Sequence, residues 1–279
     1  MAVLLALISS FAIGGADFIG GRLSARTSAT AVVTLVGSVD LVLFAVASLV
    51  TRPDPSGSDL AWAALAGVLG ALSFVAFLRA LAKGPMSIVS PFTALVGVAT
   101  PFVAGLLAGE RPSGMAWIGC VLGVIAVGMS AAKRSAPGAP AGAEPATLLL
   151  AAASGLGFGG FVIALEQTST ASGVAPIVVV RLVGVALLAV ISLTRRLPVL
   201  PPRPLRRTAI GMGVLQSVAT GALILALHDG ALTLVGVVSS LYPVTTVLLA
   251  TWILGEQLDR LHRIGVALAL IAVISIAAG

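Results

Sequence analysis

Long apolar runs, separated by short polar connections, follow one another along the whole chain. A helix needs about 20 apolar residues to cross the hydrocarbon core of a bilayer. Ten runs approach that length, at 2–19, 29–50, 60–81, 86–108, 114–132, 146–165, 174–193, 208–227, 231–254 and 261–278. The runs lack the alternation of polar and apolar residues that marks a membrane barrel. The pattern therefore predicts an all-α integral membrane protein with ten transmembrane helices.

Two connections are longer than the others and differ in composition. Residues 133–145 are rich in Pro, Gly and Ala and predict a linker at the middle of the chain. Residues 194–207 hold five arginines and several prolines and predict an extended basic loop. The other connections are short, so consecutive helices are expected to be antiparallel.

The second half of the chain resembles the first at a nearly constant offset, which indicates an internal repeat. With a shift of 146 residues, Gly109-Glu110 aligns with Gly255-Glu256. With a shift of 145 residues, Gly14-Gly15 of the first run aligns with Gly159-Gly160 of the sixth. Apolar composition alone produces chance matches among Ala, Leu and Val, but it does not easily produce a paired Gly-Glu at one offset.

Each half contains five runs, and this odd number makes the second half enter the membrane in the opposite sense. We therefore predict a first five-helix repeat at 1–132, the linker at 133–145 and a second, inverted five-helix repeat at 146–279. Two inverted repeats that enclose a site at the membrane midplane are a recurring design of secondary transporters.

Composition narrows the classes of function. The chain has 279 residues, of which 58% are hydrophobic and 9% charged, and its mean hydropathy is +1.14. A soluble domain carries about 25% charged residues. The net charge of +6 does not indicate nucleic-acid binding, because the basic residues form no continuous stripe. The single Cys120 excludes an internal disulfide and a CxxC metal or redox site, so we expect no cofactor and no metal.

These features together resemble the EamA family of the drug/metabolite transporter superfamily, over nearly the whole chain. The resemblance is carried by the two five-run halves, Gly109-Glu110 and Gly255-Glu256 at the ends of runs four and nine, Ser240-Leu241-Tyr242-Pro243-Val244-Thr245, and Arg181. It implies export, sometimes uptake, of small metabolites such as amino acids, or of drugs. The first half departs from the pattern, because Gly97 stands at the position that matches Pro243 and Val36 at the position that matches Arg181.

Ionisable residues inside the predicted spans are the first candidates for a site, because charge is costly within a bilayer. Asp40 lies near the middle of the second run and Arg181 in the first half of the seventh. Arg181 aligns with position 36, one helical turn from Asp40, so both charges are expected to face one central cavity. Either Arg181 holds a substrate carboxylate and Asp40 a proton or a substrate amine, or the two form an ion pair that locks two helices.

Further candidates lie near the ends of spans. Asp17 and Glu166, on repeat-related helices, are either gate residues at a cavity mouth or interfacial charges in contact with water. Glu110 and Glu256 each follow a glycine that can end a helix. For both we favour a structural role, with the carboxylate just ahead of the next helix N-terminus, over a role in coupling. His262 lies at a loop edge and is expected to be solvated.

Less specific candidates are polar, aromatic and proline side chains within the spans. Tyr242 and Phe158 are expected either in a cavity wall or as core filler, and Ser10 and Gln216 are candidate polar contacts. Pro243 can free backbone carbonyl groups for a site or simply kink its helix.

Lys and Arg are unevenly distributed over the connections. Every second connection, beginning with the first, belongs to a set that holds thirteen of them, whereas the other set holds Arg52 and Arg111. The positive-inside rule places the first set in the cytoplasm and both termini outside. The family resemblance implies both termini inside, and we follow the charge bias.

The leading hypothesis is a multi-pass secondary transporter of the cytoplasmic (inner) membrane that moves small molecules by alternating access. Its expected partners are a small-molecule substrate and the lipid bilayer, with protons as a candidate coupling ion, no nucleic acid, and a monomer or homodimer as the assembly. No P-loop and no HExxH pair is found, so we expect no ATP-driven step and no enzyme. A non-transporting scaffold or subunit, which predicts no central cavity, and an intramembrane enzyme are the alternatives.

Overall fold

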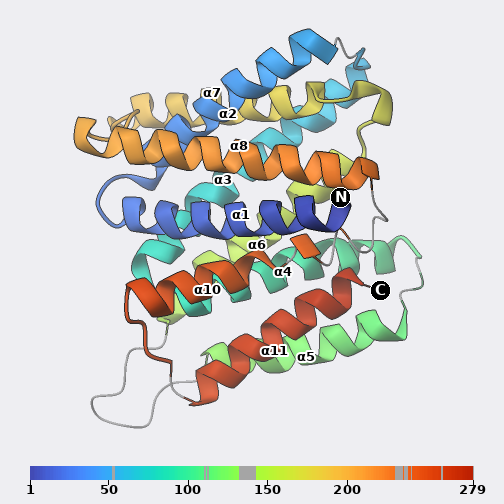
Figure 1. The fold of residues 1–279 in the computed structure, drawn as a ribbon, viewed down its shortest axis with the longest axis vertical. Helices are drawn as coiled ribbons and strands as arrows, with labels where there is room; N and C mark the ends of the chain where they lie inside the picture. Colours follow the sequence, from blue (N-terminus) through green and yellow to red (C-terminus); the bar gives the residue numbers. More distant parts are fainter. Residues whose placement is uncertain are drawn as a thin grey trace.

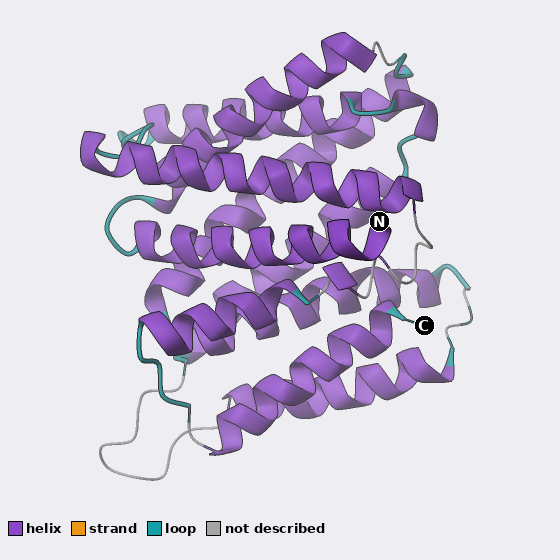
Figure 2. Cartoon of the chain, viewed as in Figure 1, coloured by secondary structure: helices purple, strands orange, loops and turns teal. Residues whose placement is uncertain are grey.

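A computed structural model of the chain describes residues 1–51, 54–109, 111, 113–131, 143–229, 235, 238–239, 241–258 and 260–278. In this part of the chain the structure contains helices and loops and no strand (Figure 2). The helices are α1 (Ala2–Ser24), α2 (Ala29–Thr51), α3 (Gly57–Lys83), α4 (Met86–Leu107), α5 (Gly114–Ala131), α6 (Pro145–Glu166), η1 (Thr170–Ser172), α7 (Ala175–Thr194), α8 (Arg203–Asp229), α10 (Tyr242–Ile253) and α11 (Arg260–Ala277).

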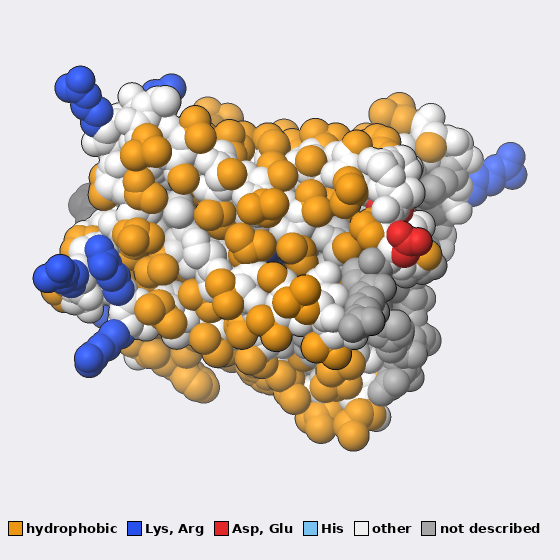
Figure 3. Space-filling view, turned by 90° about the horizontal axis from the view of Figure 1, so that it is seen from above, with side chains coloured by type: hydrophobic (Ala, Val, Ile, Leu, Met, Phe, Trp, Pro, Cys, Tyr) orange, Lys and Arg blue, Asp and Glu red, His pale blue; other side chains and the backbone are white. Residues whose placement is uncertain are grey.

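Length and composition fit many of these helices to a bilayer. Among the described residues, seven helices are long and apolar enough to cross one, namely α1, α2, α3, α4, α6, α7 and α8. Hydrophobic side chains cover the middle of the face seen in Figure 3, and Leu49, Val124 and Trp252 are among the most exposed. Such a large apolar surface suits lipid rather than water. The chain is therefore a multi-pass helical membrane protein, while the count of ten spans stays a prediction.

Three element boundaries differ from the sequence pattern or lie partly beyond the described residues. The segment 194–207, predicted as an extended loop, is helical from Arg203 onward, because its later arginines form the first turns of α8. Helix α1 continues to Ser24 instead of ending near residue 19. Asp17 therefore lies about two turns inside the helix. The first part of the run expected at 231–254 falls largely outside the described residues.

The main helix pairs correspond when the two halves are exchanged, although a few pairs, such as α4 with α11, have no equally extensive counterpart. Helix α1 packs on α8 and α10, and the corresponding helix α6 packs on α3 and α4. Likewise α2 packs on α8 as α7 packs on α3, and α2 packs on α7, α4 on α10 and α5 on α11. In Figure 1, α5 and α11 lie together at one edge of the bundle, and α2, α7 and α8 lie at the opposite edge. The helices between these edges enclose the centre of the molecule.

Repeat-related glycines lie where helices cross closely. A Cβ atom at Gly14 of α1 would stand 2.6 Å from the Cβ atom of Thr245 on α10, and the Thr246 hydroxyl donates to the Gly14 carbonyl oxygen at 3.1 Å. At Gly159 of α6, a Cβ atom would overlap the side chain of Thr100 on α4. Small residues allow such close helix approach in membranes, so both crossings depend on glycine.

The largest buried apolar cluster lies at the end of the bundle where α1 finishes. Its members include Leu23, Leu81, Met86, Leu148 and Met212, from the last turns of α1 and α3 and the first halves of α4, α6 and α8. Most Lys and Arg side chains in Figure 3 project from this same end. We call it the basic end, and we call the opposite end, where both termini lie in Figure 1, the terminal end. Tight apolar packing closes the basic end.

Candidate functional site

A cavity of about 370 Å³ lies in the middle of the bundle, between helices of both halves. Its wall is formed by residues of α1, α3, α4, α6, α7, α8 and α10. Five residues singled out from the sequence line it, namely Asp17, Phe158, Arg181, Gln216 and Tyr242. Ser10 and Glu166 do not line it: Ser10 is buried elsewhere on α1, and Glu166 is exposed at the end of α6.

Aromatic rings form a large part of the wall, from Phe74, Phe77, Phe158, Phe161 and Tyr242. The ring of Phe158 stands edge-on to Phe77, with centroids 5.9 Å apart, and tilted against Phe74 at 6.3 Å. Phe74, Phe77 and Phe161 escaped the sequence reasoning. Their spacing of three residues, Phe74 to Phe77 and Phe158 to Phe161, places each pair on one helix face and could have revealed them.

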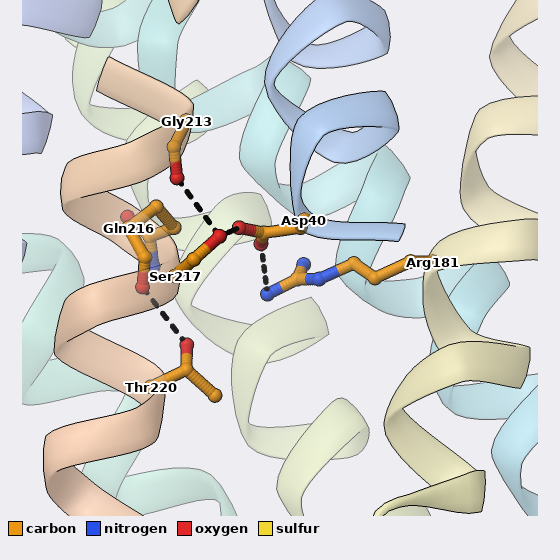
Figure 4. A network of polar contacts seen from close by, with 6 residues as sticks. All are labelled: Asp40, Arg181, Gly213, Gln216, Ser217 and Thr220. Carbon is orange, nitrogen blue, oxygen red and sulfur yellow. Dashed lines mark hydrogen bonds and ion pairs between the residues drawn. The ribbon is translucent and has the colours of Figure 1, made fainter. Parts of the chain in front are cut away.

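An ion pair between α2 and α7 adjoins the cavity wall. Arg181 on α7 places Nη2 2.9 Å from Oδ2 of Asp40 on α2, in a geometry that makes an ion pair without an aligned hydrogen bond. The Ser217 hydroxyl of α8 donates to the other Asp40 oxygen and lies 3.0 Å from the Gly213 carbonyl oxygen. Figure 4 shows Asp40 held between Ser217 and Arg181. Three helices therefore meet at this carboxylate.

The structure corrects one expectation about this pair. Asp40 was predicted to face the cavity together with Arg181, but its side chain is completely buried and is not part of the cavity wall. Arg181 does line the cavity, and its side chain is 25% exposed. Gly213 permits this arrangement, because a Cβ atom there would stand 2.8 Å from Val39 Cβ and would push α8 away from α2.

Four buried polar atoms of the cavity residues have no hydrogen-bond partner among the described residues. They are Asp17 Oδ2, Thr93 Oγ1, Arg181 Nε and Gln216 Oε1. Buried polar groups in proteins are almost always hydrogen-bonded. Four such groups around one hollow therefore fit a cavity that receives a polar partner from outside the chain.

Asp17 is the acidic residue of this wall, and its burial overturns one of its two expected environments. Only 3% of its surface is exposed, so it is not an interfacial charge in contact with bulk water. No ion pair or hydrogen bond joins it to a described residue. With the shift of 145 residues it aligns with Val162, which lines the same cavity. One of two equivalent positions thus carries a carboxylate and the other a valine.

Glu256 forms a clamp at the basic end, where it binds the N-terminus of a different helix from the one expected. It accepts hydrogen bonds from the amides of Met86 at 2.9 Å and Ser87 at 3.0 Å, and from the Ser87 hydroxyl at 2.6 Å. It therefore caps α4 and not the following helix α11. Gly109 and Gly255 adopt φ of +90° and +65° just after α4 and α10, the left-handed conformation in which glycine ends helices. Glu110 lies outside the described residues.

A second clamp, which the sequence did not reveal, lies at the terminal end. Asp59 at the start of α3 accepts from the Ser56 amide at 3.0 Å, within a capping box. It also accepts from the Ser169 amide at 2.9 Å and the Ser172 hydroxyl at 2.7 Å. This carboxylate joins α3 to the connection between α6 and α7.

The expectation of a solvated His262 was wrong, since only 2% of this residue is exposed.

Comparisons with known proteins agree with this geometry. The model of the EamA-like transporter family matches residues 1–132 and 145–278. No curated protein matches the chain. Solved structures do, and one crystal structure has a TM-score of 0.59 at 18% sequence identity, covering 96% of this chain and 96% of that chain. At this identity the likeness shows the fold alone.

Proposed function

The chain belongs to the EamA-like transporter family, and from this premise we propose that it is a secondary transporter of small molecules. The proposed substrates are metabolites such as amino acids, or drug-like compounds, carried across the cytoplasmic membrane by alternating access, with export as the favoured direction. One observation carries the proposal: a central cavity built from both halves, with four buried polar atoms that have no partner among the described residues.

The size and chemistry of the cavity support this function over a scaffold. A cavity of about 370 Å³ falls within the range of about 300–1,000 Å³ that is usual for small-molecule sites. A non-transporting scaffold has no need of such a hollow, and unpartnered polar groups inside it would only destabilise the protein. Mostly apolar walls with a few convergent polar groups are typical of a ligand site.

We propose that segments 1–132 and 146–279, joined by the linker 133–145, are inverted repeats that rock against each other around the cavity. The correspondence of the main helix pairs when the halves are exchanged supports this arrangement. If the basic end faces the cytoplasm, the apolar cluster there closes the cavity on the cytoplasmic side, and both termini lie outside. Opening that side requires the cluster and the Glu256 clamp to separate.

The ion pair suggests a division of labour between its two residues. Asp40 and Ser217 hold the Arg181 guanidinium in place, while the exposed part of the Arg181 side chain lines the cavity and is available to a polar group of the substrate. Asp40 is thus proposed as a positioning residue. Asp17, which lies in the wall itself, is the residue proposed to bind a coupling proton.

Flux measurements in proteoliposomes test this proposal. Labelled amino acids and organic cations are loaded in turn, with and without an imposed pH gradient, for wild type, Asp17→Asn and the control Glu166→Gln, whose carboxylate is exposed and outside the cavity. We expect gradient-dependent flux of at least one compound, its loss in Asp17→Asn and its retention in Glu166→Gln. Absence of flux for every compound, in protein shown to be folded, would count against a transporter.

A further inference from the structure

Taking the proposed function as its basis, we infer that the central cavity binds small organic cations, with Asp17 as the counter-charge and the surrounding aromatic rings as the rest of the site. The inference rests on the balance of charge in the cavity, on the chemistry of its wall and on the unpartnered oxygen of Asp17.

The charges around the cavity do not cancel. Arg181 carries a positive charge, but Asp40 stands 2.9 Å from it and balances it. Asp17 has no such partner among the described residues, and it is 3% exposed. A buried carboxylate without a counter-charge is very costly, so it is stabilised by taking up a proton or by pairing with a cation. The cavity can therefore take up one positive charge. It offers no uncompensated positive charge that would bind an anion.

The wall selects the kind of cation. Phe74, Phe77, Phe158, Phe161 and Tyr242 surround the hollow, and ring faces attract cations more strongly where water is excluded. A strongly hydrated ion such as Na⁺ gains little from rings, because they replace its water poorly. An ammonium group with hydrocarbon substituents is weakly hydrated and also buries apolar surface. The site therefore fits substituted ammonium compounds with a small aromatic or aliphatic body.

A proton and such a cation would compete for Asp17, and this competition supplies coupling. The exchange is balanced, since the protonated carboxyl binds the cation and releases one proton. Tyr242 of α10 and Arg181 of α7 are the titratable residues that share the cavity wall with Asp17. The other described titratable side chains on helices that pack against α1 lie away from the cavity. Asp40 belongs to the ion pair, and Asp59 belongs to the clamp at the terminal end. The remaining ones lie toward the basic end, namely Arg79, Lys83, Arg203, Arg206 and Arg207. Asp17 is thus the group expected to release the proton.

Binding of phenyltrimethylammonium to the purified full-length chain in detergent tests the inference. This probe has a permanent charge and no proton to lose, so any proton released must come from the protein. Affinity is measured by equilibrium dialysis of labelled probe, and proton release by a pH indicator in weakly buffered solution. Phenylacetate and phenylalanine, an anion and a zwitterion with the same ring, serve as competitors. The variants are Asp17→Asn, Asp17→Glu and the exposed control Glu166→Gln.

We expect wild type to bind the probe and to release up to one proton per bound cation, more at acidic than at alkaline pH. Asp17→Asn should lose at least about 30-fold in affinity, as for the loss of one partner of a buried charge pair, and should release no proton. Asp17→Glu should retain proton release. Equal affinity of wild type and Asp17→Asn, binding without proton release at every pH, or stronger competition by phenylacetate than by unlabelled phenyltrimethylammonium would overturn the inference.

Binding and flux measured on the same protein distinguish failure of the cation site from failure of the transporter function. If the probe binds with proton release but no compound crosses the membrane in proteoliposomes, the cation site stands and the transporter fails. If amino acids are transported and the probe does not bind, the transporter stands and the substrate class is wrong. A Phe158→Leu variant keeps a large apolar side chain at this position and removes the ring, and we expect it to bind the probe several-fold more weakly. Unchanged affinity in this variant would exclude the aromatic contribution.

Discussion

Removing the charge of Asp40 should destabilise the protein more than removing both charges of the ion pair. In Asp40→Asn the Arg181 guanidinium keeps its charge but loses the carboxylate 2.9 Å away. Breaking a buried pair costs about 3–5 kcal/mol because one charge is left uncompensated. Arg181 is 25% exposed to the cavity, where water can reach it, so we expect the lower figure of about 3 kcal/mol.

The double variant Asp40→Asn with Arg181→Gln leaves no unpaired charge. Its loss of stability should be about 1 kcal/mol or less, since neutral replacements of a buried pair are often close to neutral. Adding Arg181→Gln to Asp40→Asn should therefore restore about 2 kcal/mol of stability, which would show that the two changes are coupled. Flux should stay below wild type in the double variant, because the Arg181 guanidinium is gone from the cavity wall.

Thermal unfolding in detergent measures these differences for wild type, both single variants and the double variant. With about 2–4 °C of midpoint shift per kcal/mol, Asp40→Asn should melt about 6–12 °C below wild type and the double variant within a few degrees of it. Equal stability of Asp40→Asn and the double variant would refute the cost assigned to the unpaired Arg181 charge. Full transport by the double variant would reduce the pair to a lock between helices.

Three further changes test the packing and the clamps. Gly14→Ala should lower stability by about 1–3 kcal/mol through overpacking against α10. The neighbouring Gly15→Ala is its control, because a Cβ atom there would meet only a leucine methyl at 3.4 Å. This control should be neutral or stabilising in the same unfolding assay. Glu256→Ala leaves two α4 amides without an acceptor and should lower the free energy of unfolding by about 1–3 kcal/mol. An unchanged unfolding midpoint would show that the clamp does not stabilise the protein. Asp59→Ala should lower the unfolding midpoint and speed proteolysis near Ser169, with Asp59→Asn in between, and identical behaviour of the two variants would contradict the clamp at the terminal end.

The apolar runs predicted most of the helices because the bilayer itself imposes a minimum length of hydrophobic sequence. The same pattern could not give the true end of α1. Polar residues such as Arg22 and Ser24 continue the helix beyond the apolar run, and a hydropathy boundary does not detect them. This is why Asp17 was expected near an interface and is found deep in the wall of the cavity.

Pairings between distant helices were harder to predict than the helices themselves. The sequence placed Arg181 and Asp40 on facing surfaces, but it did not show that α8 approaches α2 at Gly213 and brings Ser217 to the carboxylate. It also indicated that Glu256 caps the next helix along the chain, whereas the structure places the N-terminus of α4 beside it. Such contacts depend on the three-dimensional arrangement, which local pattern does not contain.

Blocking the cavity is the most direct test of the claim that substrate crosses the protein through it. In a Cys120→Ala background, Val162→Cys places a thiol in the cavity wall, and Glu166→Cys places one about a turn away at the exposed end of α6. Both variants are treated with a membrane-impermeant thiol reagent in proteoliposomes, and flux is measured. We expect modification of Val162→Cys to abolish flux, substrate to protect it, and modified Glu166→Cys to transport normally. Full flux through completely modified Val162→Cys would contradict a central pathway.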